Sequence, residues 1–421
     1  MRTRLMTAWV MLLIVLGARE IAAQSNDVER DSATRVTPAA ESEEVGTVTR
    51  WRARYAALNE KGLSFTVGSI LPGSKLSAGF ELGRDRILGT PLGASFAAEW
   101  SVRGYQQYDV RVGKMKGRNR RAELRPVDVD LSSMHNDNSL LAFGTSLFVH
   151  VRQRVYPRMD FFGLGQRTDF AGRSDYKIAG PSIDVVAQWQ RDKHFGIAGR
   201  YGKLDLSLGD PTNDGVPNVE TIYTPATAPG VDVERQYQVG GVAATLDFRD
   251  RPRLTSKGTF AAVGIWHAMP DDVDDDRSNW MRLVADVRHF VPVRSENHVI
   301  ALRLLFSSRL GAVHTATPFY LQPTLGGSKT LRGFRSHRLR GDAVWATNAE
   351  YRWRPHKWVE IAPFLDLGAV APRFGELGSA HLEVSPGIGF RATADSLVIG
   401  RIDVAHSRDG IRVLLAVSAP F

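Results

Sequence analysis

The sequence predicts an all-β protein, a 16-stranded antiparallel transmembrane β-barrel with a long outer loop folded inward. Three observations carry this prediction. Segments of ten to fifteen residues alternate between apolar and polar side chains from residue 63 to the end. Beyond the N-terminus no run reaches the roughly 18 apolar residues of a membrane-spanning helix. Trp and Tyr stand near the segment ends, and the polar faces carry many charges of both signs, as an interfacial girdle and a hydrated lumen would require.

Composition agrees with this class and excludes others. The 421 residues are 43% hydrophobic and 24% charged, which excludes intrinsic disorder over the whole chain. There is no cysteine, so disulfide frameworks, thiolate metal sites and cysteine nucleophiles are excluded together. The mean hydropathy of −0.20 is mild, as expected where only every second residue faces lipid.

The N-terminal region is predicted to lie outside the barrel. Residues 1–23 have the form of a secretory signal peptide, with two arginines before a short apolar core and a small residue at Ala23. Residues 24–62 form a polar segment without strand or helix periodicity and are predicted to be disordered. The barrel is assigned to residues 63–421.

The alternating segments number sixteen, an even number that leaves both chain ends on the same side of the membrane. The connections between them are alternately long and short from the fifth strand onward. The predicted strands are 63–71, 74–84, 91–103, 105–115, 139–156, 175–190, 193–208, 234–249, 258–269, 279–293, 297–312, 342–354, 358–371, 382–393, 396–407 and 411–421.

The last strands show the alternation most clearly. Val398 and Ile402 are predicted on one face of their strand, opposite Arg401. The final strand places six apolar residues on one face: Ile411, Val413, Leu415, Val417, Ala419 and Phe421. A terminal aromatic residue on such a strand resembles the assembly signal of bacterial outer-membrane barrels, and Phe421 is predicted to act as that signal.

Two motifs in the second half suggest a lumen contact. The long connection 313–341 contains Leu331, Arg332, Gly333 and Phe334, and the strand 358–371 contains Phe364, Asp366 and Gly368. Alternation puts Asp366 on the lumen face together with Glu360. Because a buried carboxylate needs a cationic partner, an arginine from a loop that folds into the barrel suits it.

These residues resemble the BamA/TamA outer-membrane assembly-factor superfamily, also called the bacterial surface antigen barrel. Further matching motifs are Phe161 to Gly165, Leu246 to Gly258, Gly387 to Phe390 and Arg401 to Asp403. The resemblance implies that Arg332 contacts Asp366 in the lumen of a 16-stranded barrel. Family members commonly carry periplasmic POTRA domains of roughly 75 residues each, and residues 24–62 are too few for one, so a member lacking POTRA domains is expected.

Several alternatives stay open on the sequence. The Arg332–Asp366 contact has either a purely structural or a gating role. The run Asp271 to Asp276 is assigned to a solvated loop rather than a calcium site, since it lacks calcium-loop glycine spacing. The basic cluster between Lys114 and Arg125 is assigned to anionic lipid head groups, and no nucleic-acid partner is expected.

The function that the resemblance implies is insertion or translocation of outer-membrane proteins or lipids, in the outer membrane of a bacterial cell. Its expected partners are outer-membrane lipid, protein or lipid substrates and a separate periplasmic protein. The alternative is a passive pore or a structural surface protein. No metal-ligand spacing, phosphate loop or nucleophile elbow occurs, so no metal, cofactor or catalytic residue is predicted and the chain is not expected to be an enzyme.

Overall fold

A computed structural model gives the structure of the chain. It describes residues 62–115, 144–212, 215–233, 235–251, 254–271, 279–311, 317–394, 397–416 and 419–421. The predicted signal peptide 1–23 lies outside the described residues. So do nearly all of the polar segment 24–62, the basic cluster after Lys114 and the acidic run after Asp271. The Asp271 carboxylate accepts a hydrogen bond from Lys203 Nζ at 2.7 Å.

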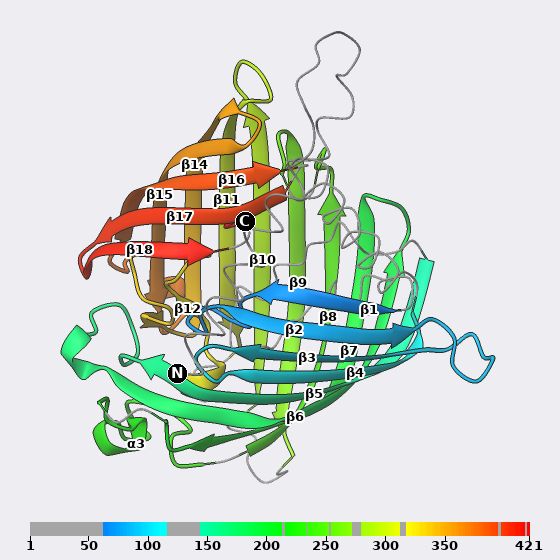
Figure 1. Cartoon of the computed structure of the whole chain (residues 1–421). Coiled ribbons are helices and arrows are strands. Elements are labelled where there is room, and N and C mark those ends of the chain that lie inside the picture. Colours follow the sequence, from blue (N-terminus) through cyan, green and yellow to red (C-terminus); the bar gives the residue numbers. More distant parts are fainter. Residues whose placement is uncertain are drawn as a thin grey trace, which may run out of the picture.

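Sixteen strands form one antiparallel sheet in chain order, as predicted, and Figure 1 shows this sheet curving around a central space. The first eight strands are β1 (Leu63–Gly68), β2 (Ser77–Arg84), β3 (Gly93–Ser101), β4 (Gln106–Lys114), β5 (Gly144–Phe161), β6 (Ser174–Gln190), β7 (Phe195–Gly209) and β8 (Arg235–Asp247). The other eight are β9 (Gly258–Pro270), β10 (Trp280–Pro292), β11 (His298–Leu310), β14 (Ala343–His356), β15 (Val359–Ala371), β16 (Glu383–Ala394), β17 (Leu397–Ser407) and β18 (Gly410–Ala416).

The remaining elements lie in the connections. Two short strands, β12 (Thr324–Leu325) and β13 (Leu339–Arg340), pair with each other between β11 and β14. The helical turns are η4 (Phe170–Gly172), α3 (Val219–Ile222), η6 (Phe319–Leu321) and η7 (Phe374–Glu376). No helix among the described residues is long and apolar enough to cross a membrane.

The two faces of the strands divide as the alternation predicts. On β11 the outward residues Ile300 and Leu302 are 39% and 40% exposed, whereas the next residue, Arg303, faces the lumen and is buried. The lumen face is rich in buried charge, and it includes Glu350, Glu360 and Asp366. We call the end of the barrel with the connections 162–173, 317–342 and 372–382 the long-loop end. The opposite end, with the turns 191–194, 293–297 and 357–358, is the short-turn end.

Each predicted strand has an observed counterpart, and three of the differences in their bounds have a clear physical cause. The first ends at Gly68 rather than residue 71, because Ser69 and Ser74 form a hydrogen-bonded turn. The fifth is observed over 144–161 and so runs past its predicted end at 156, while residues 139–143 of the prediction lie outside the described residues. It continues through Pro157 because a register shift between Tyr156 and Met159 absorbs the missing backbone donor.

The last strand is also shorter than predicted. β18 ends at Ala416, and Phe421 does not share a face with Ile411 and Val413. Its ring is 7% exposed and belongs to a buried cluster with Phe290, Val299 and Ala301 on β10 and β11. An edge strand has hydrogen-bonding partners on one side only, so a longer β18 would form few additional hydrogen bonds. Burial of the Phe421 ring in the lumen is more favourable than those bonds.

Over the part of the chain that the structure describes, the sheet is not closed by hydrogen bonds. Among the described residues β18 pairs only with β17 and β1 only with β2, so a seam separates the two ends of the sheet. Figure 1 shows β1 in blue and β18 in red as these two edges. The outward side chains of β18 reflect the missing neighbour, because Ile411 and Leu415 are 73% and 77% exposed.

Candidate functional site: a loop tip held in the lumen

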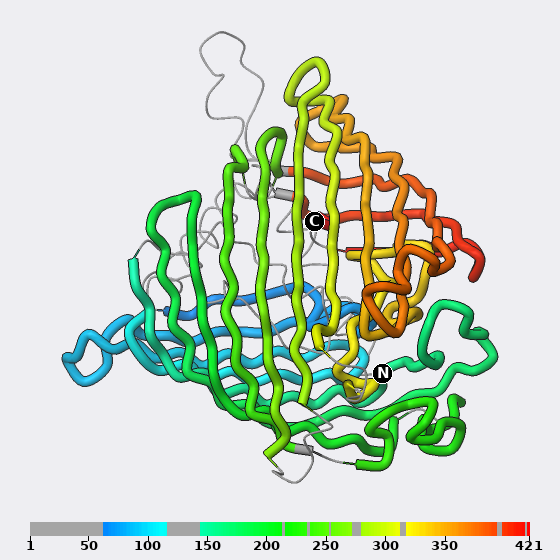
Figure 2. Tube along the Cα trace, turned by 180° about the vertical axis from the view of Figure 1, so that it is seen from behind, coloured from blue at the N-terminus to red at the C-terminus, as the bar shows by residue number. Residues whose placement is uncertain are grey.

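The connection between β11 and β14 brings its tip against the lumen face of the wall. Its segment 324–340 is closed at the base by β12 and β13 and turns at Gly326 and Gly327, both with positive φ. In Figure 2 this segment, drawn in yellow, lies beside the orange strands β14 and β15. Leu331 and Phe334 are fully buried and pack in one apolar cluster with wall residues of β14 and β15. The apolar residues of the motif therefore seat the tip on the wall.

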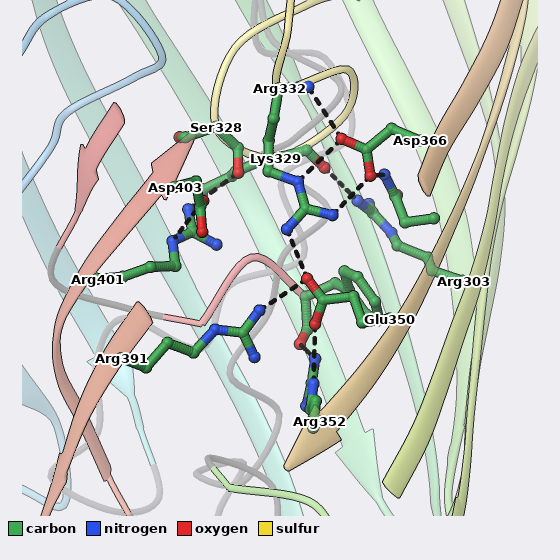
Figure 3. Close-up of polar contacts among 12 residues, drawn as sticks. Arg303, Ser328, Lys329, Arg332, Glu350, Arg352, Asp366, Arg391, Arg401 and Asp403 are labelled. Atoms are coloured by element: carbon green, nitrogen blue, oxygen red, sulfur yellow. Dashed lines mark hydrogen bonds and ion pairs between the residues drawn. The ribbon is translucent and has the colours of Figure 1, made fainter. Parts of the chain in front are cut away.

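Arg332 and Asp366 form the predicted contact. Arg332 Nε donates to Asp366 Oδ2 at 2.9 Å and Nη2 donates to Oδ1 at 2.6 Å, which is a bidentate pair. The backbone N–H of Arg332 also donates to Oδ2, at 3.0 Å. Both side chains are buried, and Figure 3 shows the guanidinium between Asp366 and Glu350.

Glu350 on β14 is the second anchor of the loop tip. Its Oε1 accepts from Arg332 Nη1 at 2.5 Å and from Arg391 Nη2 at 2.7 Å, and its Oε2 accepts from Arg352 Nε at 2.8 Å. Arg391 in turn donates to Glu360 Oε1 at 2.6 Å. Asp366, Glu350 and Glu360 thus meet Arg332, Arg352 and Arg391, and Glu360 Oε2 also lies 3.5 Å from Arg354 Nε. Each buried carboxylate therefore has at least one cationic partner, as burial requires.

Phe364 supplies an aromatic face to the same guanidinium. The Arg332 Cζ atom lies 3.3 Å from the centroid of its ring, in cation–π geometry. The ring reaches this place over Gly387 on β16, where a Cβ atom would lie 2.3 Å from Phe364 Cζ. The glycine of the Gly387 motif therefore makes room for the aromatic residue of the Phe364 motif.

Close approach also explains the two other motif glycines. A Cβ atom on Gly333 would lie 2.5 Å from the carbonyl oxygen of His406, so only glycine lets the tip approach β17 this closely. Gly333 N–H donates to Ser385 Oγ and Gly333 O accepts from Ser407 Oγ, each at 2.7 Å. At Gly368 an added Cβ would lie 3.0 Å from Leu325 Cδ1, so this glycine admits the base of the loop.

Three successive carbonyl groups of the tip are held by three different strands. Ser328 O accepts from Arg401 Nη2 on β17 at 3.0 Å, and Lys329 O accepts from Arg303 Nη1 on β11 at 2.7 Å. Thr330 O accepts from Asn348 Nδ2 on β14 at 2.6 Å. These wall side chains fix the backbone of the loop, so the tip position does not depend on Arg332 alone.

The sequence motifs find most, but not all, of this site. The structure brings Leu331, Arg332, Gly333 and Phe334 together with Phe364, Asp366 and Gly368, whereas Phe421 lies apart, near the short-turn end. Sequence reasoning missed Glu350, Asn348 and Ser385 as partners. Alternation on the strand does put Asn348 and Glu350 on the polar lumen face, which was the available signal. No group of three metal-ligating side chains occurs among the described residues.

Phe421 has its own pocket in the lumen wall. Its ring centroid lies 6.4 Å from that of Phe290, and the Arg352 guanidinium lies 5.1 Å and 5.3 Å from the Phe421 and Phe290 rings. Arg352 also bonds Glu350, so the pocket and the loop-tip site share one residue. The proposed assembly-signal role of Phe421 stays a prediction.

Known proteins resemble this chain in sequence family and in fold. The Omp85 superfamily domain model matches residues 142–394. Among solved structures, BamA from Haemophilus ducreyi lacking POTRA domains 1–3 is 14% identical with a TM-score of 0.59, covering 85% of this chain and 69% of that chain. CdiB from Escherichia coli is 12% identical with a TM-score of 0.50, covering 85% of this chain and 63% of that one.

None of the curated proteins matches the chain in sequence. The family match nevertheless spans more than half of the chain, and it includes β5 to β16 with the loop-tip site. The structural matches agree with it in fold. The chain therefore belongs to the Omp85 superfamily, as an outer-membrane β-barrel of the BamA/TamA type.

Proposed function

We propose that this barrel inserts outer-membrane proteins or lipids by opening at the seam between β1 and β18. The observation that carries the proposal is the seam itself. The described residues of β1 and β18 make no hydrogen bonds to each other, whereas every other neighbouring pair in the sheet is hydrogen-bonded. An edge with unpaired backbone groups next to lipid is a weak point in a membrane barrel.

The strands beside the seam are also short. β1 has 6 residues and β18 has 7, whereas β5 has 18 and β10 has 13. A membrane-spanning strand needs about 9–11 residues, so the seam side of the barrel spans less of the bilayer than the opposite wall. A locally thinner bilayer lowers the barrier to inserting a polypeptide or a lipid there.

The proposal places the barrel in the outer membrane of a bacterial cell, with the long-loop end outside and the short-turn end in the periplasm. Its partners are outer-membrane lipid, an unfolded barrel polypeptide or a lipid as substrate, and a separate periplasmic protein that delivers it. Nucleic acid is not among them. No catalytic step is assigned to the chain.

The experiment measures folding of an unfolded β-barrel polypeptide into lipid vesicles with and without this protein. Because the chain has no native cysteine, Val67→Cys and Ile411→Cys can be joined selectively across the seam by a flexible bis-maleimide. We expect the wild type to accelerate folding and the joined variant to lose that acceleration. The pair Leu302→Cys and Ala349→Cys, which are register partners within the wall, is the control and should keep it when joined.

Full acceleration by the barrel with the joined seam would contradict the proposal. The alternative, a passive pore, is tested by the conductance of purified protein in planar bilayers. We expect a silent barrel, because the loop tip is held against the lumen face by buried ion pairs with β14 and β15. Steady conductance in the wild type that rises in Arg332→Ala would favour the pore instead.

A further inference from the structure

Two adjacent loop residues contact both sides of the seam at the long-loop end. We call β1 with the turn 69–76 the first lip, and β18 with the hairpin turn 408–409 the last lip. His337 bonds Pro72 of the first lip, and Arg338 bonds Asp409 of the last lip. Because His337 and Arg338 are consecutive, the loop between β11 and β14 joins two lips that are not hydrogen-bonded to each other.

His337 holds the first lip through its ring. Nε2 lies 3.0 Å from the carbonyl oxygen of Pro72, which can only accept, so Nε2 carries the proton in this bond. Nδ1 lies 3.1 Å from Thr324 Oγ1, which fixes the ring from the loop side. The side chain is 4% exposed. A buried imidazole with both nitrogens engaged is a specific contact rather than a surface encounter.

Arg338 holds the last lip through its guanidinium. Nε donates to Asp409 Oδ2 at 2.7 Å, and Nη2 lies 3.4 Å from Oδ1. The other donors reach the connection 162–173, where Nη1 bonds Thr168 Oγ1 at 2.6 Å and Nη2 bonds Thr168 O at 2.8 Å. The guanidinium is 1% exposed, so this ion pair is protected from solvent screening.

Both lips are braced where the loop holds them. In the first lip, Ser74 N–H donates to Leu71 O, and Arg103 Nη1 donates to Gly73 O at 2.7 Å. In the last lip, Arg408 donates to Gln166 O at 2.6 Å and pairs with Glu383. A rigid attachment point transmits the position of the loop to the edge strand beside it, β1 or β18.

The backbone at His337 is strained. Its φ is 60°, in the left-handed region that favours glycine, and it is one of three described non-glycine residues there. Leu88, another of them, is almost fully exposed in the turn between β2 and β3, whereas His337 is buried between the lips. A conformation of this kind persists only where the surrounding contacts impose it.

We propose that His337 and Arg338 are positioning residues that clasp the two lips of the seam, so that the seam opens only when these contacts break. This inference rests on the proposed function, since it names the contacts that control the opening through which insertion would occur. The clasp acts at the long-loop end of the seam.

The first experiment measures the separation of the lips. Spin labels on Val67→Cys and Ile411→Cys report the distance between β1 and β18 in the full chain. His337→Gly removes the ring and relieves the backbone strain, and Arg338→Gln removes the charge at nearly constant length. We expect Arg338→Gln to raise the population of long distances about tenfold, because a hydrogen bond to a charged group contributes on the order of one decade in equilibrium constant. His337→Gly should raise it by a smaller factor, because the bond that it removes goes to a backbone carbonyl group.

Matched controls separate the clasp from general loosening. Leu88→Gly removes a strained non-glycine residue from an exposed turn, and Arg373→Gln removes an exposed ion pair with Glu376 outside the seam. Both should keep the wild-type distance distribution. Heat-modifiable gel mobility identifies any variant that fails to fold. Folded His337→Gly and Arg338→Gln variants with wild-type distances would overturn the inference.

The second experiment makes the contact of the loop with the first lip covalent and reversible, while Arg401 and Ser407 hold the same loop to β17 beside the last lip. A Cβ atom on Gly73 would lie 3.4 Å from Ser336 Cβ, about the separation that a disulfide bridges. Gly73→Cys with Ser336→Cys should block the acceleration of client folding when oxidised and restore it on reduction. Because one folded sample is compared in two redox states, a folding defect caused by the positive φ of Gly73 cancels.

The outcomes distinguish the clasp from the proposed function. If the wild type accelerates client folding and the oxidised lock does too, the clasp is wrong and the function stands. If no client folding is accelerated but the clasp variants still separate the lips, the proposed function fails while the clasp remains a closure device. Unchanged distances together with an ineffective lock reject the clasp in either case.

Discussion

Arg332 lies between two carboxylates that come from different strands, Asp366 on β15 and Glu350 on β14. A buried guanidinium needs more than one acceptor, because the free-energy cost of removing it from water exceeds the attraction of a single carboxylate. The ring of Phe364 covers its remaining face. The contact therefore joins a loop to two wall strands through one residue, and breaking either carboxylate contact leaves charge without compensation.

Asp366→Asn is expected to destabilise the barrel by about 3–5 kcal/mol, the usual cost of removing one partner from a buried ion pair. It should also expose the loop, so that trypsin cleaves after Lys329 or Arg335 in the folded protein. Urea unfolding in lipid vesicles and limited proteolysis measure the two effects. The conservative control is Asp271→Asn, which removes an exposed partner of Lys203. Equal stability and equal proteolysis of Asp366→Asn and wild type would contradict the role given to this contact.

Asp250 in the short turn 248–257 gives a pH prediction outside the membrane-spanning strands. Partial burial raises its pKa, but the N–H groups of Ser256 and Lys257, at 3.0 Å and 3.2 Å from Oδ1, outweigh this and hold the pKa below its usual value of 3.8. The carboxylate therefore stabilises the turn above its unfolded-state pKa, and this stability is lost as pH falls through the lower folded value.

The matched variant is Asp250→Asn. It should lower the free energy of unfolding at neutral pH and make the difference from wild type shrink as the pH falls below 3.8 and through the lower pKa of the folded state. Urea unfolding midpoints between acidic and neutral pH measure the difference. A difference that stays constant over that range would show that the Asp250 charge does not stabilise the turn.

The sequence predicted the site residues that belong to recognisable motifs. It did not predict the partners that only the three-dimensional structure brings together. Arg332 and Asp366 were paired because each stands in a recognisable motif and their charges need each other. Glu350 stands in no motif, although alternation put it on the lumen face. Which lumen charge meets which is set by the register between strands, β14 with β15 for example, and a single sequence does not contain that register.

At the scale of elements, the end of β18 gives a third prediction. Phe421 is buried against Phe290, Val299 and Ala301. Phe421→Ala should reduce the free energy of docking by about 2 kcal/mol, roughly a thirtyfold rise in the undocked fraction of the tail. The labelling rate of Ala419→Cys by a bulky maleimide measures that fraction.

Phe374→Ala is the control for this experiment, because its ring is 64% exposed in η7. It should leave the labelling rate of Ala419→Cys unchanged. Equal labelling rates in Phe421→Ala and wild type would show that the ring does not hold the tail in the lumen.

Strand positions were predictable to within a few residues wherever period-two alternation was unbroken. The errors occur where one residue breaks the period. On β17 a register shift opposite Ala392 and Thr393 puts Val398 in the lumen and leaves Ile402 outside, although simple alternation gives them the same face. The predicted fifth strand stops at residue 156, whereas the observed one continues past Pro157, because a register shift between Tyr156 and Met159 accommodates the proline.

At the scale of the whole molecule the barrel is asymmetric. The wall opposite the seam consists of strands of 13 residues and more, such as β10, while the two seam strands have 6 and 7. A bilayer that matches the long strands is thicker than the apolar band of the short ones. Lipid must therefore thin next to the seam, or the edge strands must leave polar backbone in hydrocarbon.

This asymmetry predicts a thickness-dependent difference between two lipid-facing sites. Nitroxide labels on Val413→Cys in β18 and on Val287→Cys in β10 report the depth of each site from collisions with a water-soluble relaxant. We expect the Val413 label to be the shallower one. The difference should grow from short-chain lauroyl to long-chain oleoyl phosphatidylcholine, since mismatch at the seam rises with bilayer thickness while β10 stays matched. Water that reaches Val413 through the lumen would give a difference independent of lipid chain length, and equal depths in both lipids would mean that the short strands do not thin the bilayer.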